Sequence, residues 1–239
     1  MAVETRTVEY KHRDTILEAV VAVDNASNQP RPVVLVSHAW GGRDEFAVQK
    51  ARDLARLGYV GFALDLYGKG KLGNNKEENS ALMTPLLDDR LLLQARMESA
   101  VEAACSQPEA DQKKIAAIGY CFGGLCVLDL ARTGASVAGV VSFHGLFHAP
   151  GNTVGRKIKS RVLVLHGYDD PMAQPDAMVA LASELTEAEA DWQIHAYGGA
   201  MHAFTNPNAA DPDFGTVYHE LADKRSWRSM VDFISECFS

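Results

Sequence analysis

Residues 114–130 read KIAAIGYCFGGLCVLDL, and this stretch decides the fold. It opens with an apolar run of strand length and then reaches GYCFG at residues 119–123. Beyond that point the apolar residues recur at the spacing of an α-helix. The stretch therefore predicts a strand, a tight turn and a helix, in that order.

The turn has the Gly-x-Cys-x-Gly form of a nucleophile elbow, in which a strained backbone lifts a reactive side chain out of a sheet. Gly119 and Gly123 would let the strand and the helix approach closely. Phe122 would begin the helix, where the backbone N–H groups and the dipole favour a thiolate or an oxyanion. The alternative is a buried structural Cys121 beside a helix-packing glycine pair. The predicted strand before the turn and the helix after it favour the elbow.

The composition indicates one soluble domain covering residues 1–239, with 47% hydrophobic and 23% charged residues. A net charge of -8 argues against nucleic acid or an anionic membrane as a partner. The N-terminal residues do not read as a secretory signal, and no apolar run approaches the roughly 20 residues that span a bilayer. The four cysteines include no Cys-x-x-Cys pair, which predicts reduced thiols in a cytoplasmic protein.

Strands and helices are expected to alternate along the chain. Strands are predicted at residues 5–10, 16–23, 33–37, 59–64, 115–118, 137–142, 161–165 and 191–196. Helices are predicted from an N-cap at Asp44 through residue 57, and at residues 77–106 with a break near Pro85, 122–132, 175–186 and 216–238. Longer loops are expected at residues 25–32, 65–75 and 197–213. This order predicts an α/β fold with a mostly parallel central sheet and helices on both faces.

Ligands of such sheets bind beyond the carboxyl ends of the strands. Five residues with reactive or polar side chains follow predicted strands: His38, Cys121, His144, Asp170 and His202. A cysteine nucleophile needs a base and a group that orients the base, and the chain order nucleophile, acid, histidine fits Cys121, Asp170 and His202. Asp169 competes for the acid position, but the spacing of Asp170 from the preceding strand fits better.

His202 lies in GGAMHAF at residues 198–204, where the glycines would let the loop curl back over the sheet edge. His12 and His219 are assigned to the surface, His195 to the last strand and His148 to a loop. His166 is expected to fix the turn that holds Asp170. A second oxyanion donor is expected in HAWGG at residues 38–42, from the backbone N–H of Ala39 or Trp40. Trp40 fits a pocket wall and a core position equally well.

Three motifs in this order, GYCFGG at 119–124, His-Gly-x-x-Asp at 166–170 and Gly-x-Met-His-Ala-Phe at 199–204, resemble the dienelactone hydrolase family. DLYG at residues 65–68 is also similar to the family's loop after the second long strand, and the resemblance extends from about residue 5 to 238. It implies an α/β-hydrolase fold, no metal and no organic cofactor. It also implies hydrolysis of a small ester or lactone through an acyl-cysteine, with Cys121, Asp170 and His202 as the triad.

The chain departs from the family pattern at two positions. Well-known members have a glutamate in the first oxyanion loop, where this chain has Ala39, so direct pairing with His202 is the expected way to activate the thiol. Those members also bind a substrate carboxylate through an arginine four residues after the catalytic histidine, where this chain has Asn206. The substitution favours a neutral substrate over the dienelactone anion.

The interpretation is therefore a hydrolase that acts on a small molecule, as a monomer or a small homo-oligomer. The residues expected to line the substrate pocket are His38, Trp40, Tyr67, His144 and Asn206. The same triad could instead cleave a thioester or an amide. A ligand-binding protein without turnover is the alternative from another class, although a binding protein has no need of all three triad groups.

Overall fold

The computed structural model describes residues 2–25 and 29–239, so the centre of the predicted loop at 25–32 lies outside the described residues. The chain forms two compact units, one ending at Ile118 and the other comprising Gly119–Ser239. No helix among the described residues has the length and apolar character needed to cross a membrane.

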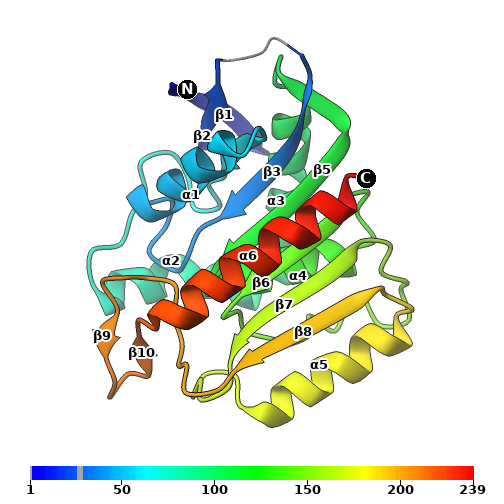
Figure 1. Cartoon of the computed structure of the whole chain (residues 1–239). Helices are drawn as coiled ribbons and strands as arrows, with labels where there is room; N and C mark the ends of the chain where they lie inside the picture. The colour runs from blue at the N-terminus through cyan, green and yellow to red at the C-terminus, as the bar shows by residue number, and fades with distance from the viewer. Residues whose placement is uncertain (1, 26–28) are drawn as a thin grey trace. The chain divides into compact units, whose positions relative to one another are not determined.

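The first unit has a mixed sheet, and two of its three helices pack against that sheet. Its strands are β1 (Val3–His12), β2 (Thr15–Asp24), β3 (Arg31–Ser37), β4 (Val60–Ala63) and the start of β5 (Ala110–Tyr120), in the order β1-β2-β4-β3-β5. Its helices are α1 (Glu45–Arg56), α2 (Lys76–Asp88) and α3 (Arg90–Cys105). The pair β3–β4 is parallel, whereas β1–β2 and β2–β4 are antiparallel. Figure 1 shows α1 in front of these strands and α3 behind them.

The apolar run in β3 is buried as the sequence predicts, because both faces of the sheet are covered. Close packing of α1 on β4 depends on Gly61, since a Cβ there would lie 2.1 Å from the carbonyl oxygen of Ala51. The helix break expected near Pro85 occurs four residues later. Pro85 lies inside α2, and Asp89 ends that helix and caps α3 by accepting a hydrogen bond from the Leu92 amide at 2.9 Å.

The second unit contains a parallel sheet in the order β6-β7-β8. Its elements are α4 (Phe122–Arg132), β6 (Gly139–Phe143), β7 (Arg161–Gly167), α5 (Pro175–Glu187), β8 (Trp192–Tyr197), β9 (Ala210–Asp211), β10 (Thr216–Val217) and α6 (Glu220–Cys237). Helix α6 contacts β6 and β7, and α4 contacts β6. Figure 1 shows α6 in front of the strands and α4 behind them. The predicted α/β class, with parallel strands between helices, is confirmed.

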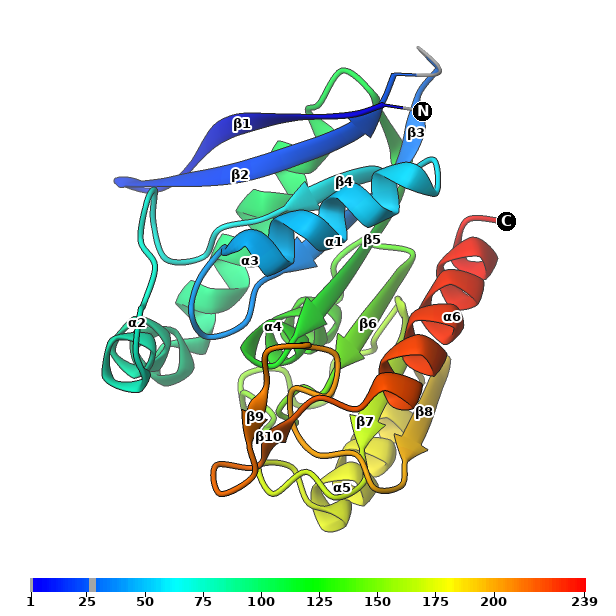
Figure 2. The ribbon, with the colours of Figure 1, turned by 60° about the vertical axis from the view of Figure 1, so that its left-hand side comes forward.

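One prediction for the second unit is wrong. The last helix does not begin at Thr216, because Thr216 and Val217 pair with Asp211 and Ala210 as a short antiparallel ladder. Figure 2 shows this ladder, β9 and β10, to the left of the start of α6. The helix then begins at Glu220, after His219 caps it by accepting from the amide of Ala222. Two-residue strands have no sequence period, so no pattern could indicate them.

Candidate active site

The elbow is formed where β5 ends at Tyr120 and α4 begins at Phe122. Cys121 lies between them at φ 55° and ψ -115°, a backbone conformation that is uncommon and strained for a residue other than glycine. Gly119 is required there, because a Cβ would lie 2.0 Å from the carbonyl oxygen of Gly123. The Cys121 side chain is partly exposed and forms no disulfide. Cys121 is therefore presented outside the sheet, as the sequence predicts.

Asp170 and His202 meet at the carboxyl end of β7. Nδ1 of His202 lies 2.7 Å from Oδ2 of Asp170, and the two side chains are almost fully buried. The other oxygen of Asp170 accepts a hydrogen bond from the Met172 amide at 2.8 Å, which fixes the carboxylate plane. Asp169 is exposed to solvent. Of the two aspartates considered, Asp170 is the one positioned to orient the imidazole.

The opposite edge of the His202 ring faces Cys121. Burial by itself lowers the pKa of His202, but the negative charge of the Cys121 thiolate and the hydrogen bonds to Asp170 and Cys121 outweigh burial and raise the pKa to about 10. Nδ1 is the nitrogen paired with Asp170, so Nε2 is the nitrogen available to the Cys121 sulfur. The arrangement favours a thiolate–imidazolium pair.

The loop that holds His202 is fixed by β10, which the sequence did not predict. The His202 amide donates to the Gly215 carbonyl at 3.0 Å, and the His202 carbonyl accepts from the Val217 amide at 3.1 Å. On either side of His202, Ala200 and Phe204 are fully buried and pack in one apolar cluster. The short ladder thus fixes the backbone of the candidate base.

In the first unit, the loop at residues 38–42 is joined to the loop after β4. His38 is buried, with Nδ1 2.7 Å from the Ala39 carbonyl and Nε2 accepting from the Leu66 amide at 3.2 Å. Burial lowers the pKa of His38. The Tyr67 hydroxyl donates to the Trp40 carbonyl at 2.9 Å. Nε2 of His38 and the Tyr67 hydroxyl connect the two loops, while Nδ1 of His38 is paired within its own loop.

Two further residues proposed for the substrate pocket lie in the second unit. His144 follows β6, is 3% exposed, and has both ring nitrogens in hydrogen bonds to protein groups. Asn206 is partly buried, and its amide oxygen accepts from the Asn208 backbone N–H at 3.0 Å within a turn. His166, expected to fix the Asp170 turn, is fully buried in β7 with its ring 5.0 Å from that of Phe147.

Three contributors to this site were missed from the sequence. They are the Met172 amide on Asp170, the Thr205 hydroxyl on His144 and the β9–β10 ladder behind His202. Thr205 is only three residues from His202, but a threonine in a loop has no distinguishing pattern. The described residues, 2–25 and 29–239, contain no group of three or more His, Cys, Asp or Glu side chains that could hold a metal ion.

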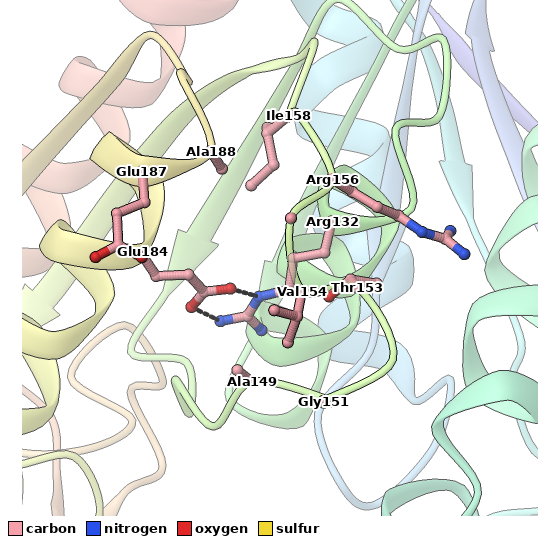
Figure 3. A pocket seen from close by; sticks show the side chains of 11 residues that line it. Arg132, Ala149, Gly151, Thr153, Val154, Arg156, Ile158, Glu184, Glu187 and Ala188 are labelled. Atoms are coloured by element: carbon pink, nitrogen blue, oxygen red, sulfur yellow. Dashed lines mark hydrogen bonds and ion pairs between the residues drawn. The ribbon is translucent and has the colours of Figure 1, made fainter.

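A pocket of about 410 Å³ lies elsewhere in the second unit and contains none of the triad residues. Figure 3 shows Arg132 at its wall in a two-pronged ion pair with Glu184, with both N–O distances 2.7 Å. Arg132 also contacts Asp129 and the carbonyl groups of Phe147 and His148. Its guanidinium is thus engaged by protein groups. We interpret Arg132 as a structural residue that holds the loop after β6 rather than as a substrate-binding group.

Known proteins match the chain along most of its length. The model of the dienelactone hydrolase family matches residues 17–238. An uncharacterized protein of Caenorhabditis elegans is 35% identical over 150 residues, which are 62% of this chain and 95% of that protein. A carboxymethylenebutenolidase of a Pseudomonas species is 28% identical over 201 residues, covering 82% of each chain.

A solved structure agrees with this assignment. The crystal structure of a dienelactone hydrolase-like promiscuous phosphotriesterase from metagenomic libraries is 37% identical, covers 100% of both chains and superposes with a TM-score of 0.94. The family model and this structural similarity agree over nearly the whole chain, so the protein belongs to the dienelactone hydrolase family and is a hydrolase of esters or lactones.

Proposed function

We propose that this enzyme hydrolyses small carboxylic esters or lactones through an acyl-cysteine intermediate, with Cys121 as nucleophile, His202 as base and Asp170 as the group that orients His202. The main support is the His202 ring, whose Nδ1 is 2.7 Å from Asp170 and whose pKa is raised to about 10 with Cys121 as a partner. Thioesters and amides remain substrates that the same triad could attack. Lactones are favoured because a named relative acts on a butenolide, which is a lactone.

Acylation begins from the thiolate–imidazolium pair. The Cys121 sulfur attacks the substrate carbonyl carbon and forms a C–S bond, while the carbonyl oxygen becomes an oxyanion. The tetrahedral intermediate collapses, the C–O bond to the alcohol breaks, and the leaving oxygen takes the proton from Nε2 of His202. For a lactone the alcohol stays attached to the acyl group.

Deacylation uses the same groups in the reverse roles. Neutral His202 takes a proton from water as the water oxygen attacks the thioester carbon. The C–S bond then breaks, the acid leaves, and the thiolate–imidazolium pair is restored. Asp170 accepts a hydrogen bond from Nδ1–H throughout, which keeps Nε2 directed at the reacting groups.

The oxyanion would be held by backbone amides. Phe122 is the first residue of α4, so its N–H lies at the positive end of the helix dipole. The second donor proposed is the N–H of Ala39 or Trp40. The experiment that tests the mechanism as a whole is ester turnover that depends on Cys121, with the acyl group found on that residue by peptide mass spectrometry of acid-quenched enzyme.

Neutral substrates should be preferred over matched anions. Asn206 offers only neutral donors, and its amide oxygen is engaged in a turn with Asn208, whereas an arginine would form a charge-assisted pair with a carboxylate. A desolvated carboxylate without a cation is costly to bind. We expect a kcat/KM ratio of neutral ester to carboxylate analogue of at least about 10 in wild type. Asn206→Arg should lower that ratio, with Asn208→Arg as the matched control at the neighbouring exposed position. A wild-type preference for the anion would contradict the prediction.

A second activity is phosphotriester hydrolysis, which is favoured by the 37% identity to the promiscuous phosphotriesterase over the full length of both chains. The Cys121 sulfur would attack phosphorus, the aryloxide would leave, and water would then release the phosphodiester. We expect p-nitrophenol release from paraoxon by wild type, more slowly than from an acetyl ester, because acyl transfer is the main reaction proposed for this triad. Cys121→Ala should lose this release and Cys105→Ala should keep it. Release by Cys121→Ala at the wild-type rate would sink the assignment.

The cellular setting is also a proposal. We place the enzyme in the cytoplasm, as a single α/β-hydrolase domain that is a monomer or a small homo-oligomer and that binds neither nucleic acid nor membranes. The support is the net charge of -8 and the four cysteines, which form no disulfide among the described residues. The proposed steps use only the substrate, water and the triad, and they require no metal or organic cofactor.

A further inference from the structure

His144 occupies an unusual position directly after β6. Its φ is 37°, a left-handed backbone conformation that most side chains avoid, and its side chain is 3% exposed. The next residue, Gly145, packs against α4 so closely that a Cβ would lie 2.9 Å from the carbonyl carbon of Gly124. This contact holds the backbone after β6 against the first turn of α4, next to the elbow.

The ring nitrogens of His144 connect the elbow to the loop of the candidate base. Nδ1 accepts a hydrogen bond from the Cys121 backbone N–H at 3.2 Å, so Nδ1 is unprotonated. The proton of the neutral ring is therefore on Nε2, which donates to Oγ1 of Thr205 at 2.8 Å. The Cys121 N–H also donates to the Phe143 carbonyl at 3.0 Å. The hydrogen bond to His144 is therefore the second one made by this N–H group.

His144 also contacts the other two segments of the triad. Its backbone N–H donates to the Leu165 carbonyl at 2.9 Å, in the strand that leads to Asp170. Its ring meets the ring of His202 edge-on, with the centroids 5.2 Å apart. The His144 ring thus contacts the backbone of the nucleophile and the ring of the base, and the His144 backbone contacts the strand before the acid.

We propose that His144 is a positioning residue that sets the distance between the Cys121 sulfur and the His202 ring by joining the elbow to Thr205. This inference rests on the proposed cysteine mechanism. His144 is not a second base, because one ring nitrogen accepts from the nucleophile's backbone and the other donates to Thr205. Loosening the connection lets the thiolate and the imidazole drift apart, and a displacement of about 1 Å can cost about 100-fold in rate.

The test separates the two hydrogen bonds. His144→Asn tolerates the positive φ, keeps an acceptor in the place of Nδ1 and loses the contact with Thr205. Thr205→Val loses the same contact from the other side, and Thr205→Ser restores the hydroxyl. For p-nitrophenyl acetate we expect kcat to fall about 10-fold in His144→Asn and in Thr205→Val, with KM within about 3-fold of wild type and Thr205→Ser near wild type. The double variant His144→Asn/Thr205→Val should resemble either single variant, because both remove one interaction.

A purely structural role is distinguished by a second readout. The rate of iodoacetamide alkylation of Cys121 at pH 6.5 reports the thiolate–imidazolium pair, and both quantities are measured on preparations whose cooperative thermal unfolding shows that the variant is folded. We expect alkylation to slow in His144→Asn and Thr205→Val and to recover in Thr205→Ser. If both quantities stay within about 2-fold of wild type in both variants, the inference is overturned while the mechanism stands. Turnover retained by Cys121→Ala would instead overturn the mechanism, and the inference with it.

Discussion

Cys121→Ala should reduce kcat for an activated aryl ester on the order of 10⁶-fold, the scale found when the nucleophile of a hydrolase triad is removed. The thiolate forms the C–S bond, and no other group at the elbow can replace it. The backbone at φ 55° is equally strained for Ala and Cys, so the melting temperature should change little. Turnover and thermal unfolding of the same preparation check both statements.

The matched control is Cys105→Ala, since Cys105 is also partly exposed but lies in α3 of the first unit. It should keep wild-type turnover. Iodoacetamide should inactivate wild type through Cys121 alone, because burial raises the pKa of Cys105 and of Cys237 and so suppresses their thiolates. Activity lost with labelling only at Cys105 or Cys237 would refute Cys121 as nucleophile.

His202→Ala should cost at least about 10²–10⁴-fold in kcat, because both proton transfers pass through Nε2. The loss should be greater than for His144→Asn, which leaves the base in place. His195→Ala, a change at a partly exposed position of β8, is the control and should leave kcat within about 2-fold of wild type. A His202→Ala enzyme with near wild-type kcat would require another base.

The same variant should change the pH dependence of alkylation. The pKa of His202 is raised to about 10, so in the paired state the imidazole stays protonated across neutral pH and stabilises the thiolate. Wild-type Cys121 should therefore react with iodoacetamide at a nearly constant rate from pH 6 to 8. In His202→Ala, which has no imidazolium, the alkylation rate of Cys121 should rise about 10-fold per pH unit until the pH approaches the ordinary thiol pKa of about 8.5. A wild-type rate that rises as steeply as that of His202→Ala would exclude the resting ion pair.

The local sequence determined the elements whose pattern is repeated over many residues. The apolar run in β3 and the alternation of strands with helices were sufficient for the α/β class, because burial on both faces leaves a continuous apolar run. The Gly-x-Cys-x-Gly pattern was also sufficient to predict the elbow. The structure gives the reason for its first glycine, because a Cβ on Gly119 would lie 2.0 Å from the carbonyl oxygen of Gly123. Chain order was enough to nominate Asp170 and His202, which the structure brings to 2.7 Å of each other.

Only the tertiary structure decided how these groups are held. The β9–β10 ladder behind His202 is two residues long, too short for any period, and it replaced the first turn expected of the last helix. His144 and Thr205 are 61 residues apart and meet through one 2.8 Å hydrogen bond. Neither residue has a local signal for that contact, because a hydrogen bond between distant loops depends on where folding places both of them. The sequence by itself determined which groups can react, and the packing of loops from β6, β7 and β8 decided their distances and protonation.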